Sequence, residues 1–477
     1  MNTVKRVARN TSIVMGGDII FRLISLFVMI YLARYLGVTD YGKYSFVFAY
    51  LAFFNIITDL GLQRILVREM ARDESIAPKL IGNAYIIRGI LAVIAVVSSV
   101  IIISLASYPA DTTTYIHIAS FTLLFISFSD FYRTIFEANL KMEYNTVAKL
   151  AFKILSAGFI LWIIYSNGTL MQIMIVLVFS EGVKTLLNYL FSRKFVRPKF
   201  EIDFKLWKFL LKECLPIALT SIIWVIYYHI DVVMLSPMMG DEAVGIYSAA
   251  HKLCDPFFLI PSGLTMSLFP LMSAYYESSE NKLIKTYTLG VRYLLIIMLP
   301  IAVGITLLAD DIIFIIYGTE FIHSTTVLQI LIWSIVFSSI NSILLSLLIS
   351  INRQKLNTLS TGVCAFVNVI LNLILIPILS YNGASIATVV TNMVLFTVCF
   401  YFVSKHLQVI PVHKMVVKPV ISGLVMGAFI YYFTRLNIFL LVPLAGIVYL
   451  MVLLTLKTFN EDDWEMVKKV LGRRRLQ

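Results

Sequence analysis

The residues of this sequence that are best placed to do chemistry are charged side chains inside long apolar segments. Asp18 and Arg22 lie in the first such segment, one turn apart and therefore on one face of a helix. His251, Lys252 and Asp255 lie together in the eighth segment. Arg22 and Lys252 suit an anionic group such as phosphate, while Asp18, His251 and Asp255 could tune those charges or bind a coupling cation. The alternative is that Asp18–Arg22 and Lys252–Asp255 are self-neutralised pairs that only fix helix packing.

Three further charged residues extend this set. Arg88 and Arg133 are also candidates for binding the anionic group, but both lie nearer one end of their segments. A long basic side chain in that position can instead extend to the water interface. Asp231 lies near the outer end of the seventh segment. It either gates that side, as a further coupling or tuning residue, or is a hydrated helix end.

The composition predicts an integral membrane protein. Of the 477 residues, 59% are hydrophobic and only 14% are charged, and the mean hydropathy is +0.88. A soluble protein is nearer half apolar and a quarter charged. Apolar stretches of about 20 residues, enough to cross a bilayer core, recur along the whole chain and leave no room for a soluble domain. They lack the alternation of a β-barrel, so we expect an all-α bundle.

About fourteen transmembrane helices are predicted. Breaker residues separate them, as at Ser166-Asn167-Gly168, Ser236-Pro237 and Asn382-Gly383. The expected helices cover 11–33, 44–66, 80–106, 115–138, 146–165, 169–191, 213–236, 244–275, 286–308, 325–350, 357–380, 384–404, 415–434 and 437–457.

Lysine and arginine gather in alternate connections, which predicts that those connections are cytoplasmic. The connection at 193–212 is the longest and most basic, whereas the turn at 237–243 contains acids and no lysine or arginine. Because the bias alternates at each crossing and the helix count is even, we expect both termini in the cytoplasm. The protein would then be a multi-pass component of a plasma or inner cell membrane.

A short repeat divides the chain into two halves. Residues 37–45 and 240–248 both read GxxxxGxYS, and both join the first two helices of a half. Six helices per half restore the same orientation, so the halves would be parallel repeats, a common transporter architecture with its substrate site between the halves. The expected divisions are a lobe at 1–192, a linker at 193–212, a lobe at 213–406, and two additional helices with a basic cytoplasmic tail at 407–477.

The linker contains the amphipathic stretch FKLWKFLLKE at 204–213. This pattern is typical of an interfacial helix that is attracted to anionic lipid. A linker that merely obeys the rule for cytoplasmic lysine and arginine would look the same.

Enzymatic motifs are missing from the sequence. It has no GxxxxGK[ST] phosphate-binding loop, no HExxH and no paired-cysteine metal site. The four cysteines lie singly in apolar segments, as expected of small core residues. We therefore expect no enzyme activity, no resident cofactor, no metal and no nucleic-acid partner.

Several segments resemble the polysaccharide biosynthesis (O-antigen flippase-like) transporters of the MOP superfamily. The opening is ARYLGVTDYGKYSFVFAY at Ala33–Tyr50, followed by DLGLQRILVREMAR at Asp59–Arg72. The second half has HIDVVMLSPMMGDEAVGIYSAAHKL at His229–Leu253 and NVILNLILIPILSYNGASIATVVTN at Asn368–Asn392. In their order and spacing these segments span nearly the whole chain.

The resemblance implies two six-helix lobes and translocation of a lipid-linked oligosaccharide on a polyprenyl phosphate or pyrophosphate. It also implies a cationic central cavity for the phosphate, onto which Arg22 and Lys252 are carried over. Membrane lipids, and a glycan polymerase or glycosyltransferases, would be its partners. Many relatives have twelve helices, and the two additional ones here resemble the pattern of the lipid II flippases.

Three functions fit these expectations. The first is a flippase for lipid-linked oligosaccharide. The second is a MATE-type multidrug exporter coupled to Na⁺ or H⁺, which a cavity richer in acids would favour. The third is a non-transporting scaffold for glycan assembly, in which the intramembrane charges would be dispensable.

Overall fold

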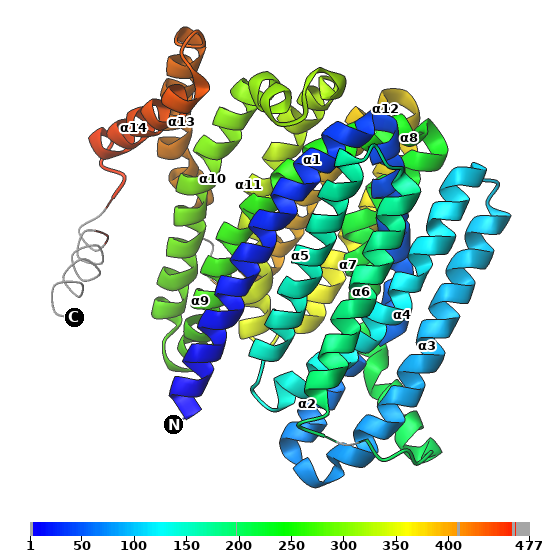
Figure 1. Ribbon diagram of the computed structural model, residues 1–477. Coiled ribbons are helices and arrows are strands. Elements are labelled where there is room, and N and C mark those ends of the chain that lie inside the picture. The colour runs from blue at the N-terminus through cyan, green and yellow to red at the C-terminus, as the bar shows by residue number, and fades with distance from the viewer. Residues whose placement is uncertain (1–2, 197, 408–410, 460–462, 464–477) are drawn as a thin grey trace. The chain divides into compact units, whose positions relative to one another are not determined.

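The computed structural model describes residues 3–196, 198–407, 411–459 and 463, and every regular element among them is helical (Figure 1). Twelve of these helices are long and apolar enough to cross a membrane. The expected all-α membrane class is therefore confirmed. Most of the basic tail, at 464–477, lies outside the described residues.

The chain forms two compact units, Met1–Ser248 and Ala249–Gln477. The helices of the first unit are α1 (Thr3–Asp59), α2 (Leu62–Arg72), α3 (Ala77–Leu105), α4 (Ala110–Ala138), α5 (Glu143–Tyr165), α6 (Leu170–Ser192) and α7 (Phe204–Met239). The unit boundary falls within α8 (Asp241–Cys254). The second unit continues with α9 (Leu259–Ser278), α10 (Glu280–Tyr317), α11 (Ser324–Ser350), α12 (Gln354–His406), α13 (Val412–Tyr432) and α14 (Ile438–Thr455).

Two of the long helices are each interrupted by one residue. α1 breaks at Gly37, where φ is 68° and ψ is −179°, and Figure 1 shows its blue ribbon returning from that turn toward α2. α12 breaks at Ser380, where φ is 52°. The predicted break at Asn382-Gly383 was therefore two residues late. Asn368 donates to the hydroxyl of Thr391 across 3.4 Å, so the two halves of α12 lie side by side and antiparallel.

Several predicted helix boundaries need correction. The helix expected over 244–275 is divided into α8 and α9 by the 3₁₀ turn at Asp255–Phe258. The helix expected over 44–66 ends at Asp59, because Leu60 and Gly61 both take positive φ. The residues after it form the separate amphipathic helix α2. α7 begins at Phe204 rather than at 213, because the Asp203 side chain accepts hydrogen bonds from the first backbone N–H groups of the helix.

The connection before α7 packs on the start of α3. The Lys199 amide donates to the Pro78 carbonyl across 2.9 Å. Asp203 pairs with Lys79 at 2.7 Å, and Trp207 donates to the Asn83 side chain across 2.8 Å. Beside this contact lies an apolar core from α2, α3, α4 and α7, whose fully buried members include Leu66, Ile81, Phe136 and Leu210.

The two copies of the GxxxxGxYS motif have the same backbone. The first glycine of each copy has positive φ with extended ψ, 68° and −179° at Gly37 and 85° and 179° at Gly240. Side-chain-bearing residues rarely adopt this conformation, which accounts for glycine at both positions. The shared geometry supports the repeat that the sequence indicated.

These copies also contact each other inside the first unit. A Cβ on Gly42 would collide with the carbonyl oxygen of Asp241, and a Cβ on Gly245 would collide with that of Val38. Gly42 and Gly245 are equivalent positions of the motif, as are Val38 and Asp241. The contact is therefore reciprocal, as at a two-fold interface.

In the second unit, α13 and α14 pack against α10, as Figure 1 shows. Their shared core includes Leu308, Ile430 and Leu453. The Tyr449 hydroxyl donates to the Ile296 carbonyl across 2.8 Å.

Candidate functional site

The first predicted pair, Asp18 and Arg22, does not form. Asp18 instead accepts from Lys149 of α5, with 2.6 Å between Oδ1 and Nζ. Arg22 is exposed and makes no hydrogen bond or ion pair within the part of the chain that the structure describes. The self-neutralised pair is wrong because a carboxylate can face a neighbouring helix as readily as its own next turn.

The structure adds two lysines to this region that the sequence analysis did not single out. Lys149 and Lys153 lie one turn apart on α5, with their ammonium groups 4.8 and 5.3 Å from the centre of the Phe21 ring. Three cations, Arg22, Lys149 and Lys153, thus accompany one acid, Asp18. The spacing of the lysines places both on one helix face, but only the packing of α5 on α1 brings them to this site.

Arg88 is fully buried on α3 and does not extend to the interface. It forms an ion pair with Asp59 at the end of α1 and donates to the Ser127 carbonyl across 2.8 Å. The interfacial alternative is therefore wrong for Arg88. Its Nε is buried without a hydrogen-bond partner.

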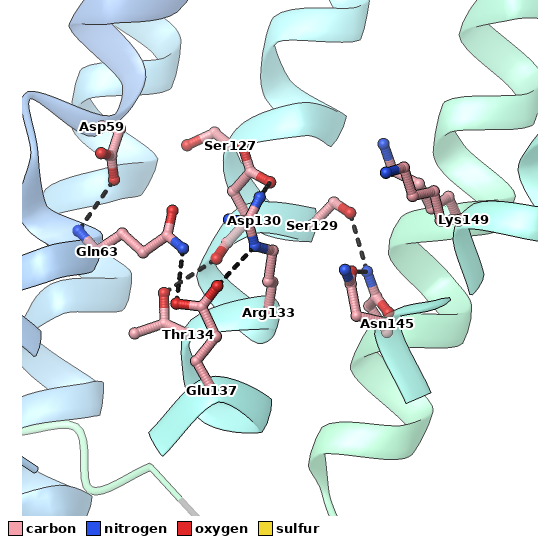
Figure 2. Close-up of polar contacts among 12 residues, drawn as sticks. Asp59, Gln63, Ser127, Ser129, Asp130, Arg133, Thr134, Glu137, Asn145 and Lys149 are labelled. Carbon is pink, nitrogen blue, oxygen red and sulfur yellow. Dashed lines mark hydrogen bonds and ion pairs between the residues drawn. The ribbon is translucent and has the colours of Figure 1, made fainter. Parts of the chain in front are cut away.

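Arg133 belongs to the same polar network, which Figure 2 shows in close-up. Its Nε donates to Glu137 across 2.9 Å, and Asp130 lies 3.8 Å away. Gln63 connects Glu137 to the Arg88 pair, since its side chain donates to Glu137 across 2.9 Å and its backbone donates to Asp59 across 3.1 Å. Two arginines therefore face three carboxylates, so the network has no surplus of positive charge.

In the second unit, the predicted pair of Lys252 and Asp255 is confirmed, with 2.9 Å between Nζ and Oδ2. The other carboxylate oxygen of Asp255 lies 3.8 Å from Nδ1 of His251. Lys252 is 44% exposed, so this cation remains open on one side. α8 ends at Cys254, and Asp255 begins a short 3₁₀ turn with Pro256.

Asp231 of α7 is buried, with 4% of its surface exposed. The Tyr247 hydroxyl donates to its Oδ2 across 2.7 Å. The hydrated helix end is therefore wrong for Asp231. Its hydroxyl partner is the tyrosine of the second GxxxxGxYS motif.

No group of three or more histidine, cysteine or acidic side chains that could hold a metal ion occurs among the described residues. The four cysteines are buried and unpaired, as the sequence predicted.

Sequence models of two protein families match this chain. The sequence model of the family "Polysaccharide biosynthesis protein" matches residues 7–276, and that of the MatE family matches 216–374. A curated relative, the "Probable low-salt glycan biosynthesis flippase Agl15" of Haloferax volcanii, is 24% identical over 44% of this chain and 45% of its own length. The chain thus spans about half the length of the curated relatives that it matches.

Two solved structures share the fold. A "Lipid II flippase MurJ, inward closed conformation" has a TM-score of 0.78 at 16% identity, over 92% of this chain and 97% of its own. An inward-facing MATE transporter of the MOP superfamily has a TM-score of 0.71 at 17% identity, over 81% and 94%. With the family match over more than half of its length, the chain belongs to the polysaccharide biosynthesis protein family, a family of multi-pass membrane transporters and not of enzymes.

Proposed function

We propose that this chain is a flippase for a lipid-linked glycan. Its substrate would be a glycan on a polyprenyl phosphate or pyrophosphate, moved from the cytoplasmic to the outer leaflet by alternating access. The flippases among its homologues support this assignment.

The helix breaks support a proposed topology of fourteen crossings. Twelve candidate spans become fourteen crossings when the two halves of α1 and of α12 each cross separately. An even number places both termini on one side of the membrane, and the positions of lysine and arginine lead us to propose that this side, with the 193–212 connection, is the cytoplasm. For the two lobes of this topology we keep the proposed bounds 1–192 and 213–406, with α13 and α14 as an addition.

The observation that carries the proposal is the cationic surface of α1 and α5. Arg22 has no acidic partner in the described structure, and Lys149 and Lys153 add two charges against the single Asp18. A phosphate that enters the bilayer must exchange water for charge-assisted contacts, and the planar fork of arginine suits phosphate oxygens. Lys252 of the second unit is half-exposed and is a further cation that could bind a phosphate.

The acids beside these cations are the proposed coupling groups. Asp18 touches Lys149, and Asp255 touches Lys252 and His251. Protonation or Na⁺ binding at either acid would release its lysine toward the substrate phosphate. Asp231 is buried and accepts a hydrogen bond from Tyr247. We propose that this contact fixes the conformation of the turn at 237–243.

For Arg88 and Arg133 we propose a structural role instead of headgroup binding. Three carboxylates already face these two arginines. An added phosphate would have to displace one of them. Both arginines are thus better suited to holding α1, α3 and α4 together.

A MATE-type exporter of cations is the second candidate, because the MatE model matches 216–374. Such a substrate would be repelled by Arg22, Lys149 and Lys153. A glycan-assembly scaffold is a third, in which none of these charges would matter for activity.

The decisive experiment reconstitutes the full chain in vesicles with a fluorescent polyprenyl-phosphate glycan. Transfer of the probe between leaflets is followed with a quencher that cannot cross the membrane. We expect Arg22→Ala and Lys252→Ala to reduce transfer at least tenfold, and Arg22→Lys to restore part of it because the charge remains without the fork.

Lys205→Gln is the matched control, since this lysine is exposed at the start of α7. It should transfer the probe at the wild-type rate. Normal transfer by both alanine variants would exclude this headgroup site, and efflux of a cationic dye by the wild-type protein would favour the exporter.

A further inference from the structure

A basic pocket of about 490 Å³ lies where the beginning and the end of α12 meet, within the second unit. It is lined by Asn352, Arg353, Gln354, Lys355, Leu356, Phe402, Lys405 and His406. Residues about fifty positions apart thus form one concave surface at the end of a candidate membrane span.

The antiparallel halves of α12 explain this meeting. Asn368 donates a hydrogen bond to Thr391, so residues at equal distances before and after this pair lie at similar levels on the two halves. Fifteen residues beyond this pair on each half, Arg353 and His406 lie at the same end of α12, and both line the pocket. The turn at Ser380 therefore determines which residues share the pocket.

The charge of the pocket is all of one sign. Arg353, Lys355 and Lys405 line it together with His406, and no carboxylate is among the lining residues. None of these four side chains forms an ion pair with any residue that the structure describes. By contrast, other basic residues near helix ends, such as Lys79, have an acidic partner.

The backbone adds to this positive potential. Arg353 is the residue before α12 and supplies no side-chain cap to the first turn. The free N–H groups at a helix start attract anions. Three uncompensated cations near such a helix end repel one another, and a bound anion would relieve that repulsion.

We propose that this pocket binds the phosphate headgroup of an anionic bilayer phospholipid. Basic pockets between transmembrane helices at the membrane surface are suited to such headgroups. Leu359 and Tyr401, 52% and 60% exposed, lie farther along the two halves of α12 and offer apolar surface for the acyl chains. The pocket uses neither Arg22 nor Lys252, and its proposed ligand does not depend on the glycan being the transported substrate.

The test uses the full-length protein in a neutral detergent, titrated with phosphatidylglycerol and, separately, with phosphatidylcholine. Native mass spectrometry counts bound lipids, and thermal unfolding measures stabilisation. We expect one saturable phosphatidylglycerol site that raises the melting temperature, and no such effect of phosphatidylcholine. Arg353→Gln with Lys405→Gln should weaken this binding about tenfold or more, because charge-assisted contacts are lost.

The matched control is Lys282→Gln with Lys414→Gln, which removes the same charge from exposed positions outside both the pocket and the 204–213 stretch. Without lipid, the pocket variant should unfold at or above the wild-type temperature, because like charges have been removed. An equal loss of phosphatidylglycerol binding in the control would contradict the assignment of the lipid site to this pocket.

Two further arms separate the sources of phosphate. Saturation by inorganic phosphate at similar concentrations would overturn a lipid ligand. Displacement of phosphatidylglycerol by equimolar polyprenyl phosphate would make the carrier lipid the occupant and overturn the assignment to a bilayer phospholipid.

Discussion

Arg88 and Arg22 are two arginines of one unit that the sequence assigned to the same task. Arg88 is fully buried against Asp59 and the Ser127 carbonyl. Arg22 is exposed and touches no acid among the described residues. The difference teaches that the packing around an intramembrane charge, and not its presence, separates a structural residue from one that is available to a ligand.

The energetic reason is desolvation. A buried charge depends on its partner, because without it the ion remains in a medium of low dielectric. An exposed or half-exposed charge loses little when its partner is removed, because water replaces the contact. The following predictions test that contrast, beginning with the most buried pair.

The largest effect is expected for Asp59→Asn. This change leaves the buried Arg88 without its carboxylate, and breaking such a pair costs about 3–5 kcal/mol. Thermal or denaturant unfolding of the detergent-purified protein measures the loss. Asp40→Asn, at a half-exposed carboxylate 3.5 Å from Lys43, is the control and should be near neutral. An equal loss of stability in the two variants would contradict the distinction between buried and exposed ion pairs.

Tyr247→Phe should have the next largest effect. It deletes the hydroxyl that donates to the buried Asp231 across 2.7 Å. An unsatisfied buried acceptor costs about 1–3 kcal/mol, more when charged. The same unfolding experiment applies, with Tyr31→Phe at an exposed ring as the control. A Tyr247→Phe protein as stable as wild type would show that Asp231 does not need this partner.

The sequence predicted the helices better than the partners of the charged residues. Hydropathy located the spans because bilayer thickness constrains their length. Hydropathy did not locate the end of α1 at Asp59, because apolar residues continue after the helix ends. It could not pair Asp18 with Lys149 or Asp59 with Arg88, which lie 131 and 29 residues apart. Such contacts depend on how the helices pack, and the spacing of residues along one helix does not predict that packing.

Asp18→Asn should change stability by only about 0–1 kcal/mol, although it lies in the same unit as Asp59. Its pair with Lys149 is about 40% exposed on both sides, and Arg22 already lacks an acid in the described chain. If Asp18 couples transport to an ion, the variant should accumulate normally and lose the ion dependence of probe transfer. A fall in abundance as large as that of Asp59→Asn would mean that Asp18 is structural.

The smallest effect is expected at the exposed connection before α7. The hydrogen bond from Lys79 holds the pKa of Asp203 below its usual value of 3.8, and the backbone N–H groups of α7 contribute. Because this pKa is lowered on folding, the contact stabilises the connection above about pH 4 and is lost as the pH falls through the lowered value. Hydrogen exchange at the Lys199 amide, which is bonded to Pro78, reports the opening. In the wild-type protein, the protection of this amide, corrected for intrinsic exchange rates, should decrease when the pH is lowered below about 4. In Asp203→Asn, the protection should be weak at every pH. Identical profiles for the two proteins would show that the ion pair does not hold the connection on α3.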